Sequence, residues 1–204
     1  LLPDFQPIRL LMEADSIPPS ISSTAGYRLP GDGDALMCGM VDHYLGVFAR
    51  LETGILPNRR PEATNFRSPG KPLLLMAVLD LIARHRLNRN FIEITDELSG
   101  RFAGSLGRLP TEIGSVRLAG PFIGLQSENF WHLLPRAVHG PADPKTITTV
   151  AQLREYYFGA KFSDDLFPLL QMQTSREKLR TALLETYFSV ELQKRLRDFS
   201  NDLV

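Results

Sequence analysis

The chain has 204 residues, of which 43% are hydrophobic and 23% are charged. This length and composition are those of one folded globular domain with a sizeable core, and they exclude collagen-like, coiled-coil and wholly disordered chains. The 23 basic residues balance the 23 acidic ones. Net charge therefore points to neither nucleic acid nor membrane as a partner, and any basic face must be local.

The single cysteine, Cys38, permits no internal disulfide and no thiolate-rich zinc site. This cysteine usage is typical of a reducing compartment, and we expect a cytoplasmic protein. The longest apolar run has seven residues, at 73–79, so we expect no membrane segment. The chain starts with Leu-Leu-Pro-Asp, without a start methionine or a signal-peptide pattern, which indicates a fragment or a processed chain.

Proline, glycine and serine interrupt residues 1–33, which we interpret as an extended lead-in or linker. Residues 34–204 are expected to form a single recognition domain. From Asp34 on, apolar residues recur at spacings of three and four. This pattern predicts a helix with Asp34 as its cap and Gly54 as its stop.

Residues 55–71 form a connection with four basic residues against one acidic residue. The connection leads into a helix that Pro72 starts, because proline suits the first helical turn. This helix is apolar around most of its circumference, and such a helix is expected to be buried at the centre of the domain.

The middle of the chain carries signals for strands as well as helices. Residues 91–94 predict a short strand, and Thr95 or Asp96 caps a helix through about Phe102. Two short apolar runs then flank Gln-Ser-Glu-Asn and predict a β-hairpin near 122–133. Helix, strand, helix and hairpin in this order are typical of a winged-helix domain.

Residues 150–200 predict a series of C-terminal helices. Their expected ranges are 150–158, 164–172, 176–188 and 191–199, the last three capped by Ser163, Ser175 and Ser189. Leu179, Leu183 and Tyr187 form an apolar stripe, which either lies back on the domain or presents a surface to a partner. The predicted fold class is therefore mainly α with a small β-hairpin, in a winged-helix-like helical arrangement.

The candidate catalytic residues do not occur in the motifs or spacings that catalysis or metal binding requires. The four histidines, at 43, 85, 132 and 139, show no metal-binding or catalytic spacing. The glycines at 100, 104 and 107 match neither a nucleophile elbow nor a dinucleotide fingerprint. We predict no enzyme activity, no cofactor and no metal site for this chain, and a hydrolase is a minor alternative.

Basic residues gather around the expected buried helix. Arg67 and Lys71 precede its start, where backbone amides and cations together can form an anion site. Between positions 84 and 117, six basic residues, all arginine, stand against four acidic ones. Guanidinium groups favour bidentate contacts with phosphates or bases. An ordinary solvated face is the alternative interpretation.

Four segments of the chain, 43–51, 68–82, 120–133 and 163–188, carry a resemblance to a known family. In their order and spacing they resemble the domain found N-terminal to HNH nuclease domains in bacterial restriction endonucleases. That family includes the sulfur-binding domains that read phosphorothioated DNA. The resemblance covers residues 43–195 and implies a DNA-binding domain.

The resemblance implies a shallow apolar cup for sulfur, which is larger, more polarizable and a weaker hydrogen-bond acceptor than oxygen. Pro121 matches the proline of the cup and Gly124 its small residue, while Lys71 matches a basic position before the buried helix. Gly120 replaces an aromatic residue of the family pattern, and Gly70 replaces a histidine. The residues expected to bind DNA or phosphorothioate are Arg67, Ser68, Gly70, Lys71, Arg117, Gly120, Pro121, Gly124 and Arg154.

The expected partner is double-stranded DNA, phosphorothioated in its backbone, and the expected role is recognition in a bacterial restriction or defence system. The sequence contains no HNH motif, so a fused or separate nuclease would cut the DNA. A homodimer is also considered. The alternative is a helical protein-interaction or dimerisation module without sulfur specificity, with its surface at the stripe through Leu179, Leu183 and Tyr187.

Overall fold

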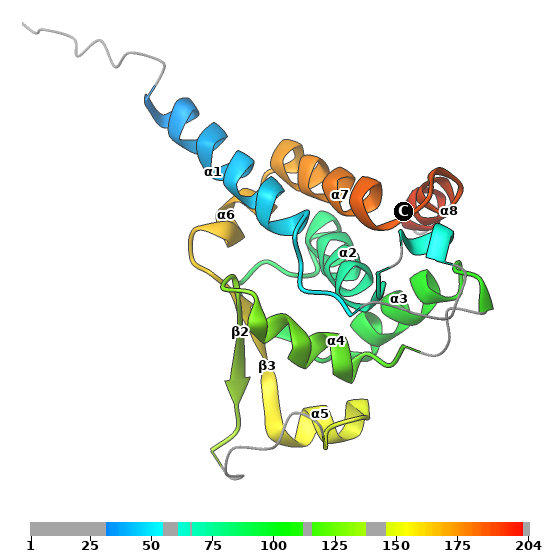
Figure 1. Ribbon diagram of the computed structural model, residues 1–204. Helices are drawn as coiled ribbons and strands as arrows, with labels where there is room; N and C mark the ends of the chain where they lie inside the picture. The colour runs from blue at the N-terminus through cyan, green and yellow to red at the C-terminus, as the bar shows by residue number, and fades with distance from the viewer. Residues whose placement is uncertain (1–31, 55–60, 66, 112–115, 138–145, 202–204) are drawn as a thin grey trace, which may run out of the picture.

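The computed structural model describes residues 32–54, 61–65, 67–111, 116–137 and 146–201 (Figure 1). Within these ranges the chain forms eight α-helices and a small antiparallel sheet of three strands. The mainly α prediction is therefore confirmed. The predicted lead-in lies outside the described residues except for its last two positions, which are helical. No helix in the described ranges is long and apolar enough to cross a bilayer.

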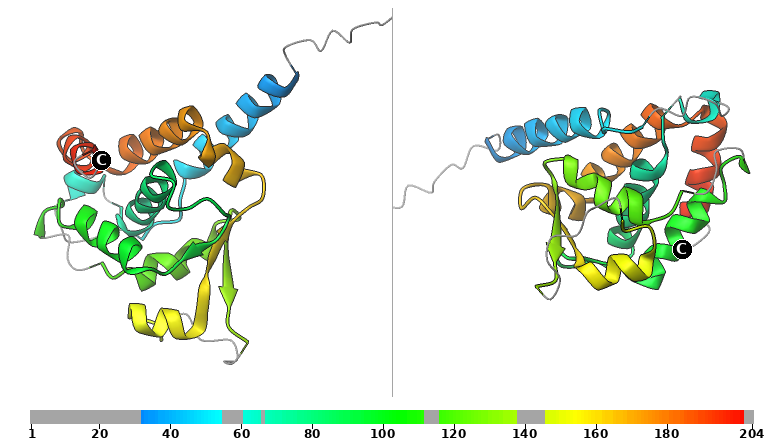
Figure 2. Two further views of the ribbon diagram at one scale, coloured as in Figure 1. Left: turned by 180° about the vertical axis from the view of Figure 1, so that it is seen from behind. Right: turned by 60° about the horizontal axis from the view of Figure 1, so that its bottom comes forward.

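The first helix, α1 (Asp32–Phe48), packs its C-terminal half on α7 (Gln173–Tyr187), and its N-terminal end projects from the body (Figures 1 and 2). It begins before the predicted cap, Asp34, and ends well before Gly54. The early end has a structural cause, because the Leu51 amide turns away and donates a hydrogen bond to the buried Tyr187 hydroxyl at 2.8 Å.

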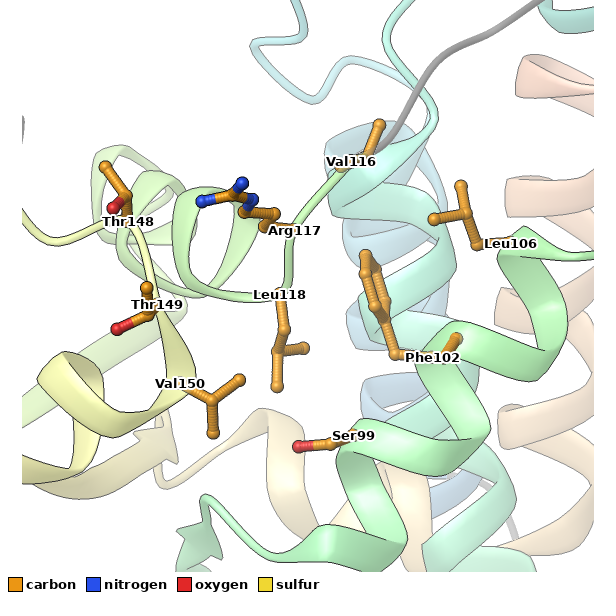
Figure 3. Close-up of a pocket in the computed structure, with 10 residues that line it drawn as sticks. Ser99, Phe102, Leu106, Val116, Arg117, Leu118, Thr148, Thr149 and Val150 are labelled. Atoms are coloured by element: carbon orange, nitrogen blue, oxygen red, sulfur yellow. The ribbon is translucent and has the colours of Figure 1, made fainter. Parts of the chain in front are cut away.

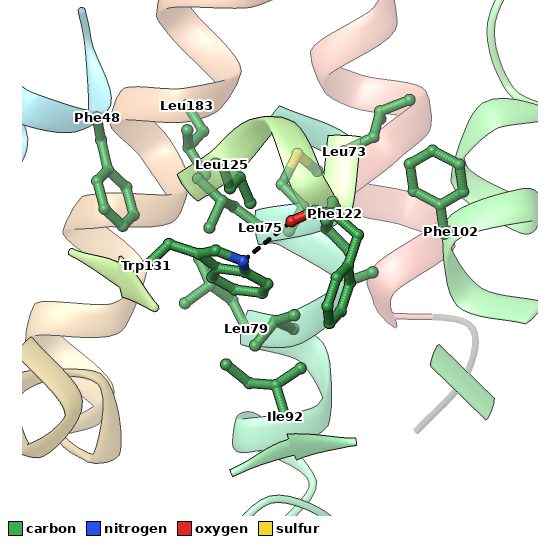
Figure 4. Packing of buried hydrophobic residues seen from close by; sticks show 14 of the residues in the cluster. Phe48, Leu73, Leu75, Leu79, Ile92, Phe102, Phe122, Leu125, Trp131 and Leu183 are labelled. Carbon is green, nitrogen blue, oxygen red and sulfur yellow. Dashed lines mark hydrogen bonds between the residues drawn. The ribbon is translucent and has the colours of Figure 1, made fainter. Parts of the chain in front are cut away.

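The central helix is α2 (Gly70–Ala83), which is buried on all sides as its composition predicts. It contacts α7, α3 (Asp96–Leu106) and α4 (Ala119–Gly124). Its leucines meet large rings from the other elements in a single core (Figure 4). Burial of each leucine side chain stabilises the folded state by about 1.5 to 3 kcal/mol of transfer free energy. The leucines of α2 are therefore a main source of the stability of the domain.

The predicted hairpin near 122–133 is wrong in its first half. Residues 119–124 form α4, and a 3-10 turn over Leu125–Ser127 follows. Ala119, Phe122 and Ile123 are all buried, and their spacing of three and four suits one face of a helix. The buried Trp131 indole N–H donates to the Phe122 carbonyl oxygen at 3.0 Å, which holds α4 on the core (Figure 4).

The second half of that predicted hairpin is strand β2 (Trp131–Pro135), which pairs with a strand that the sequence analysis missed. This strand, β3 (Tyr157–Phe162), is central in the order β1-β3-β2, where β1 is Ile92–Glu93. The helix predicted for 150–158 therefore ends early, as α5 (Val150–Tyr156). The short strand predicted at 91–94 is confirmed by β1.

The C-terminal helices after the sheet are α6 (Leu166–Gln171), α7 and α8 (Val190–Asn201). The predicted cap Ser163 instead hydrogen-bonds the Tyr44 hydroxyl at 2.9 Å, and the predicted cap Ser175 is buried within α7. The side chains of the apolar stripe, Leu179, Leu183 and Tyr187, are fully buried. The stripe therefore lies back on the domain and is not a partner surface. The winged-helix arrangement is not confirmed, because the hairpin that would form the wing is a helix followed by a strand.

Candidate functional site

A surface hollow of about 280 Å³ lies where the starts of α2 and α4 meet the loop that follows α1. Its lining residues are Glu52, Thr53, Gly54, Ser68, Gly70, Lys71, Val116, Gly120 and Pro121. Five residues of the predicted DNA-binding set are among them, although they come from two distant parts of the sequence. We call this feature the α2–α4 hollow.

Two of the three glycines that line the α2–α4 hollow, Gly70 and Gly120, have opposite surroundings. A Cβ atom at Gly70 would lie 2.6 Å from Cγ of Pro121 and 3.0 Å from Cγ1 of Val116. A Cβ atom at Gly120 would meet nothing within 4 Å. Gly70 thus lets the starts of α2 and α4 pack together, whereas position 120 has room for a larger side chain.

Lys71 extends from the first turn of α2 and is held on two sides. Its Nζ atom lies 2.7 Å from Glu128 Oε1 and donates to Ser127 Oγ at 2.9 Å. The Lys71 and Glu128 side chains are only 11% and 9% exposed, so the pair is largely removed from water. An ammonium group has three N–H donors, and among the described residues partners are found for only two of those of Lys71. Gly124 lies beside this side chain, because a Cβ there would be 3.4 Å from Lys71 Cε.

Glu128 also fixes the wall of the α2–α4 hollow. Its Oε1 atom accepts a hydrogen bond from the Glu52 amide at 2.9 Å. The Ser68 amide ties the same loop to α2 by donating to the Gly54 carbonyl oxygen at 2.8 Å. Sequence reasoning missed Glu128, because it was assigned to the turn of the predicted hairpin. The sequence signal that could have identified Glu128 is its position as an acidic residue within the segment 120–133, which carries the resemblance.

Arg67 lies next to the α2–α4 hollow on an exposed face. Its guanidinium carbon is 5.4 Å from the centre of the Tyr187 ring, and Nη1 donates to the Ala49 carbonyl oxygen at 3.4 Å. Burial raises the pKa of Tyr187, whereas the Leu51 amide and the charge of Arg67 act in the opposite direction. Arg67 therefore has a fixed position and an accessible charge.

The structure does not bring Arg117 and Arg154 into the α2–α4 hollow. Arg117 is exposed and lines a neighbouring pocket, which shares Val116 with the hollow. Arg154 binds the Ile94 carbonyl oxygen at 2.7 Å and the Asp96 carboxylate at 2.6 Å. Its guanidinium thus joins α5 to the start of α3, and this structural use accounts for the residue.

Histidines and acidic residues do not form a metal centre in the part of the chain that the structure describes. Within those ranges no group of three or more histidine, cysteine, aspartate or glutamate residues is placed to hold a metal ion. His43 lies on α1, His85 follows α2, and His132 lies on β2. His139 lies outside the described residues.

Comparison with known proteins adds no assignment to this geometry. The sequence matches no family model, and the comparison with curated proteins finds no match. The resemblance to sulfur-binding domains stays a prediction.

Proposed function

We propose that this protein recognises double-stranded DNA at the α2–α4 hollow and reads a phosphorothioate in the DNA backbone. The observation that carries the proposal is the position of the Pro121 ring, which lines the hollow together with the Lys71 side chain. An apolar wall beside an ammonium group suits an anion that bears a large, weakly accepting atom. The role would be that of a recognition domain in a bacterial restriction or defence system, and a winged-helix-like mode of DNA binding is part of the proposal.

The apolar lining of the α2–α4 hollow supports sulfur over oxygen. Glu128 already neutralises Lys71 and Glu52 also lines the hollow, so charge attracts a phosphate and a phosphorothioate equally weakly, and the preference depends on the apolar surfaces. Sulfur gains more than oxygen from contact with the apolar surfaces of Pro121 and Val116. The exposed Arg67 and Arg117 would then supply the salt-dependent attraction to neighbouring phosphates.

The alternative function, a helical interaction or dimerisation module, has lost its predicted surface. Its stripe on α7 is fully buried between helices of the same chain. A partner would have to use another face.

A fluorescence-anisotropy titration tests the proposed function. It compares two short duplexes that are identical except for one phosphorothioate, across several salt concentrations. We expect about tenfold tighter binding of the modified duplex, or about 1.4 kcal/mol, and affinity that falls as salt rises. Equal binding of the two duplexes would contradict sulfur reading, and absence of binding would contradict the DNA proposal.

A charge placed in the α2–α4 hollow localises the effect. Pro121→Asp sets a carboxylate on the apolar wall and is expected to weaken binding of the modified duplex more than binding of the unmodified one. Gln126→Asp is the matched control, because Gln126 is exposed on the following turn and does not line the hollow. Equal losses on both duplexes in the Pro121 variant would argue against an apolar sulfur site.

A further inference from the structure

A second pocket opens on the other side of Val116, between α3, the segment that enters α4, and the start of α5 (Figure 3). Its volume is about 390 Å³, within the range of sites that hold small organic ligands. The lining residues are Ser99, Phe102, Ala103, Leu106, Val116, Arg117, Leu118, Thr148, Thr149 and Val150. We call it the α3–α5 pocket.

The α3–α5 pocket is apolar on one side and polar at one edge. Figure 3 shows Phe102 and Leu106 on the side of α3, Leu118 between Phe102 and Val150, and the Arg117 guanidinium directed towards the side of Thr148. The apolar side chains come from two elements that pack on the core, so they form a fixed surface. A ligand in this pocket would therefore have a hydrophobic body and a polar end.

The hydroxyl groups that line the α3–α5 pocket are already engaged. Ser99 Oγ donates to the Thr95 carbonyl oxygen at 3.0 Å. The hydroxyls of Thr148 and Thr149 lie 3.4 and 3.2 Å from the side-chain oxygen of Gln152, which accepts from both. The protons of these hydroxyls are therefore engaged, so toward a ligand they can act only as acceptors and cannot donate to an anionic group.

Arg117 is different from these hydroxyl groups. Its side chain is exposed, and no hydrogen-bond or ion-pair partner is found for it among the described residues. A guanidinium group offers donors in a planar fork that matches a carboxylate and cannot be deprotonated in proteins. The polar end of a ligand in this pocket should therefore be a single anionic group.

The wall of the pocket that α5 forms is preorganised in the absence of a ligand. Thr149 caps α5 through a capping box, in which its hydroxyl accepts from the Gln152 amide at 3.2 Å and the Gln152 side chain accepts from the Thr149 amide at 3.1 Å. A capping box fixes the backbone at the helix start. Little ordering of this wall is then needed when a ligand binds, which favours affinity.

We propose that the α3–α5 pocket binds a small amphipathic carboxylate, with its aliphatic chain or single ring against Phe102 and Leu118 and its carboxylate paired with Arg117. This site adjoins the α2–α4 hollow, with which it shares Val116, and the proposal does not depend on the DNA-reading function. The apolar lining excludes strongly polar ligands, and the charge of Arg117 disfavours amines.

Isothermal titration calorimetry on the whole chain tests this site, with octanoate and 4-phenylbutyrate as probes and octylamine as the charge-reversed control. We expect at least one of the two acids to bind and octylamine not to bind. Arg117→Gln should weaken binding by about tenfold, the loss expected for one charge-assisted contact. The matched control is Arg89→Gln, an exposed arginine that does not line the pocket and should leave binding unchanged.

A second variant tests the apolar part of the site. Ala103→Trp, at an exposed position on the lining of the pocket, should fill the space and abolish binding while Arg117 is intact. Circular dichroism shows whether each variant is folded. Because Arg117 is exposed, Arg117→Gln still tests the site if the Ala103 variant does not fold. Failure of both acids to bind up to about 10 mM, equal binding of octylamine, or unchanged binding in Arg117→Gln would overturn the proposal.

Discussion

The two ends of α2 each carry a buried ion pair, and the two pairs differ in the residues that surround them. At the C-terminal end Asp80 pairs with Arg180, and Ser200 Oγ donates to both carboxylate oxygens at 3.1 Å. Arg180 in turn donates to Ser200 Oγ at 3.0 Å. At the N-terminal end Lys71 pairs with Glu128 beside an apolar wall.

The comparison separates scaffold from site. The Asp80–Arg180 pair fastens α2 to α7, and Ser200 joins it to α8. This pair also borders a pocket, but the residues around it are mostly charged or polar, among them Arg84, Glu177 and Arg197. The Lys71–Glu128 pair instead lies beside the apolar surfaces of Val116 and Pro121. A buried ion pair next to open space is therefore not enough to indicate a sulfur site, and the apolar wall is the informative feature.

The largest expected effect comes from breaking the Asp80–Arg180 pair. Arg180→Met leaves the Asp80 carboxylate buried without its cation, so we expect the free energy of unfolding to fall by about 3 to 5 kcal/mol. Urea denaturation measures this loss. Asp198→Ala, on the exposed part of α8, is the control and should change stability by no more than about 0.5 kcal/mol. A loss below about 1 kcal/mol in Arg180→Met would contradict the scaffold role.

A smaller effect is expected where α2 and α4 approach each other. Gly70→Ala forces a methyl group within 2.6 Å of the Pro121 ring, and such overpacking costs about 1 to 3 kcal/mol. It should also weaken DNA binding, because Pro121 must move. Gly120→Ala has open space and should leave stability nearly unchanged. Thermal unfolding and anisotropy compare the two variants, and similar stability of both would refute the close approach at Gly70.

The N-terminal pair is tested by replacing both partners. Lys71→Met with Glu128→Gln removes the two charges together, so it avoids an unpaired buried charge and should cost little stability. It should nevertheless weaken binding of phosphorothioated DNA, because the ammonium group beside the apolar wall is lost. The matching replacement, Arg180→Met with Asp80→Asn, should leave DNA binding unchanged. Equal losses in the two double variants would erase the distinction between scaffold and site.

The salt dependence of DNA affinity tests whether the exposed Arg67 contacts DNA. Arg67→Gln removes an accessible cation beside the α2–α4 hollow, so the slope of log K against log salt should become shallower by about 0.9. The double variant at Lys71 and Glu128 should change this slope less, since Lys71 is already neutralised in the free protein. An unchanged slope in Arg67→Gln would remove Arg67 from the DNA contact.

The smallest effect belongs to an exposed carboxylate at the start of α6. Hydrogen bonds from Ser163 and Tyr44 lower the pKa of Asp165 below its ordinary value. A depressed pKa in the folded state means that this contact stabilises the protein above the unfolded pKa, and the contribution is lost as the pH falls through the folded pKa. Urea midpoints should therefore fall less steeply with acidification in Asp165→Asn than in the wild type. Identical pH profiles would contradict the contact.

The sequence predicts α2 because a run of seven apolar residues after a proline is compatible with few structures other than a buried helix. The segment 122–125 was misread, since a short apolar run does not distinguish a strand from a buried helix. The sequence does not predict strand β3, because the segment Tyr-Phe-Gly-Ala-Lys-Phe lacks β-branched residues and follows a helix that begins with a capping box. Tertiary pairing with β1 and β2 decided its structure.

The site was predicted in part. The resemblance placed Lys71 and Pro121 together, and the structure brings both to one hollow. Glu128 could not be assigned, because its role depends on the closeness of Glu52, Lys71 and Glu128 in space and not on their spacing in the sequence. Arg154 belongs to the predicted set only through the resemblance, and its guanidinium donates to the Ile94 carbonyl oxygen and to Asp96.

Hydrogen–deuterium exchange with the phosphorothioated duplex, the unmodified duplex and no DNA tests the central claim most directly. The account predicts that the modified duplex slows amide exchange at residues 67–74 and 116–122, where the α2–α4 hollow lies, and leaves the end of α2 with α8 unchanged. Slowed exchange at the Asp80–Arg180 end, or no difference between the two duplexes at the hollow, would contradict it.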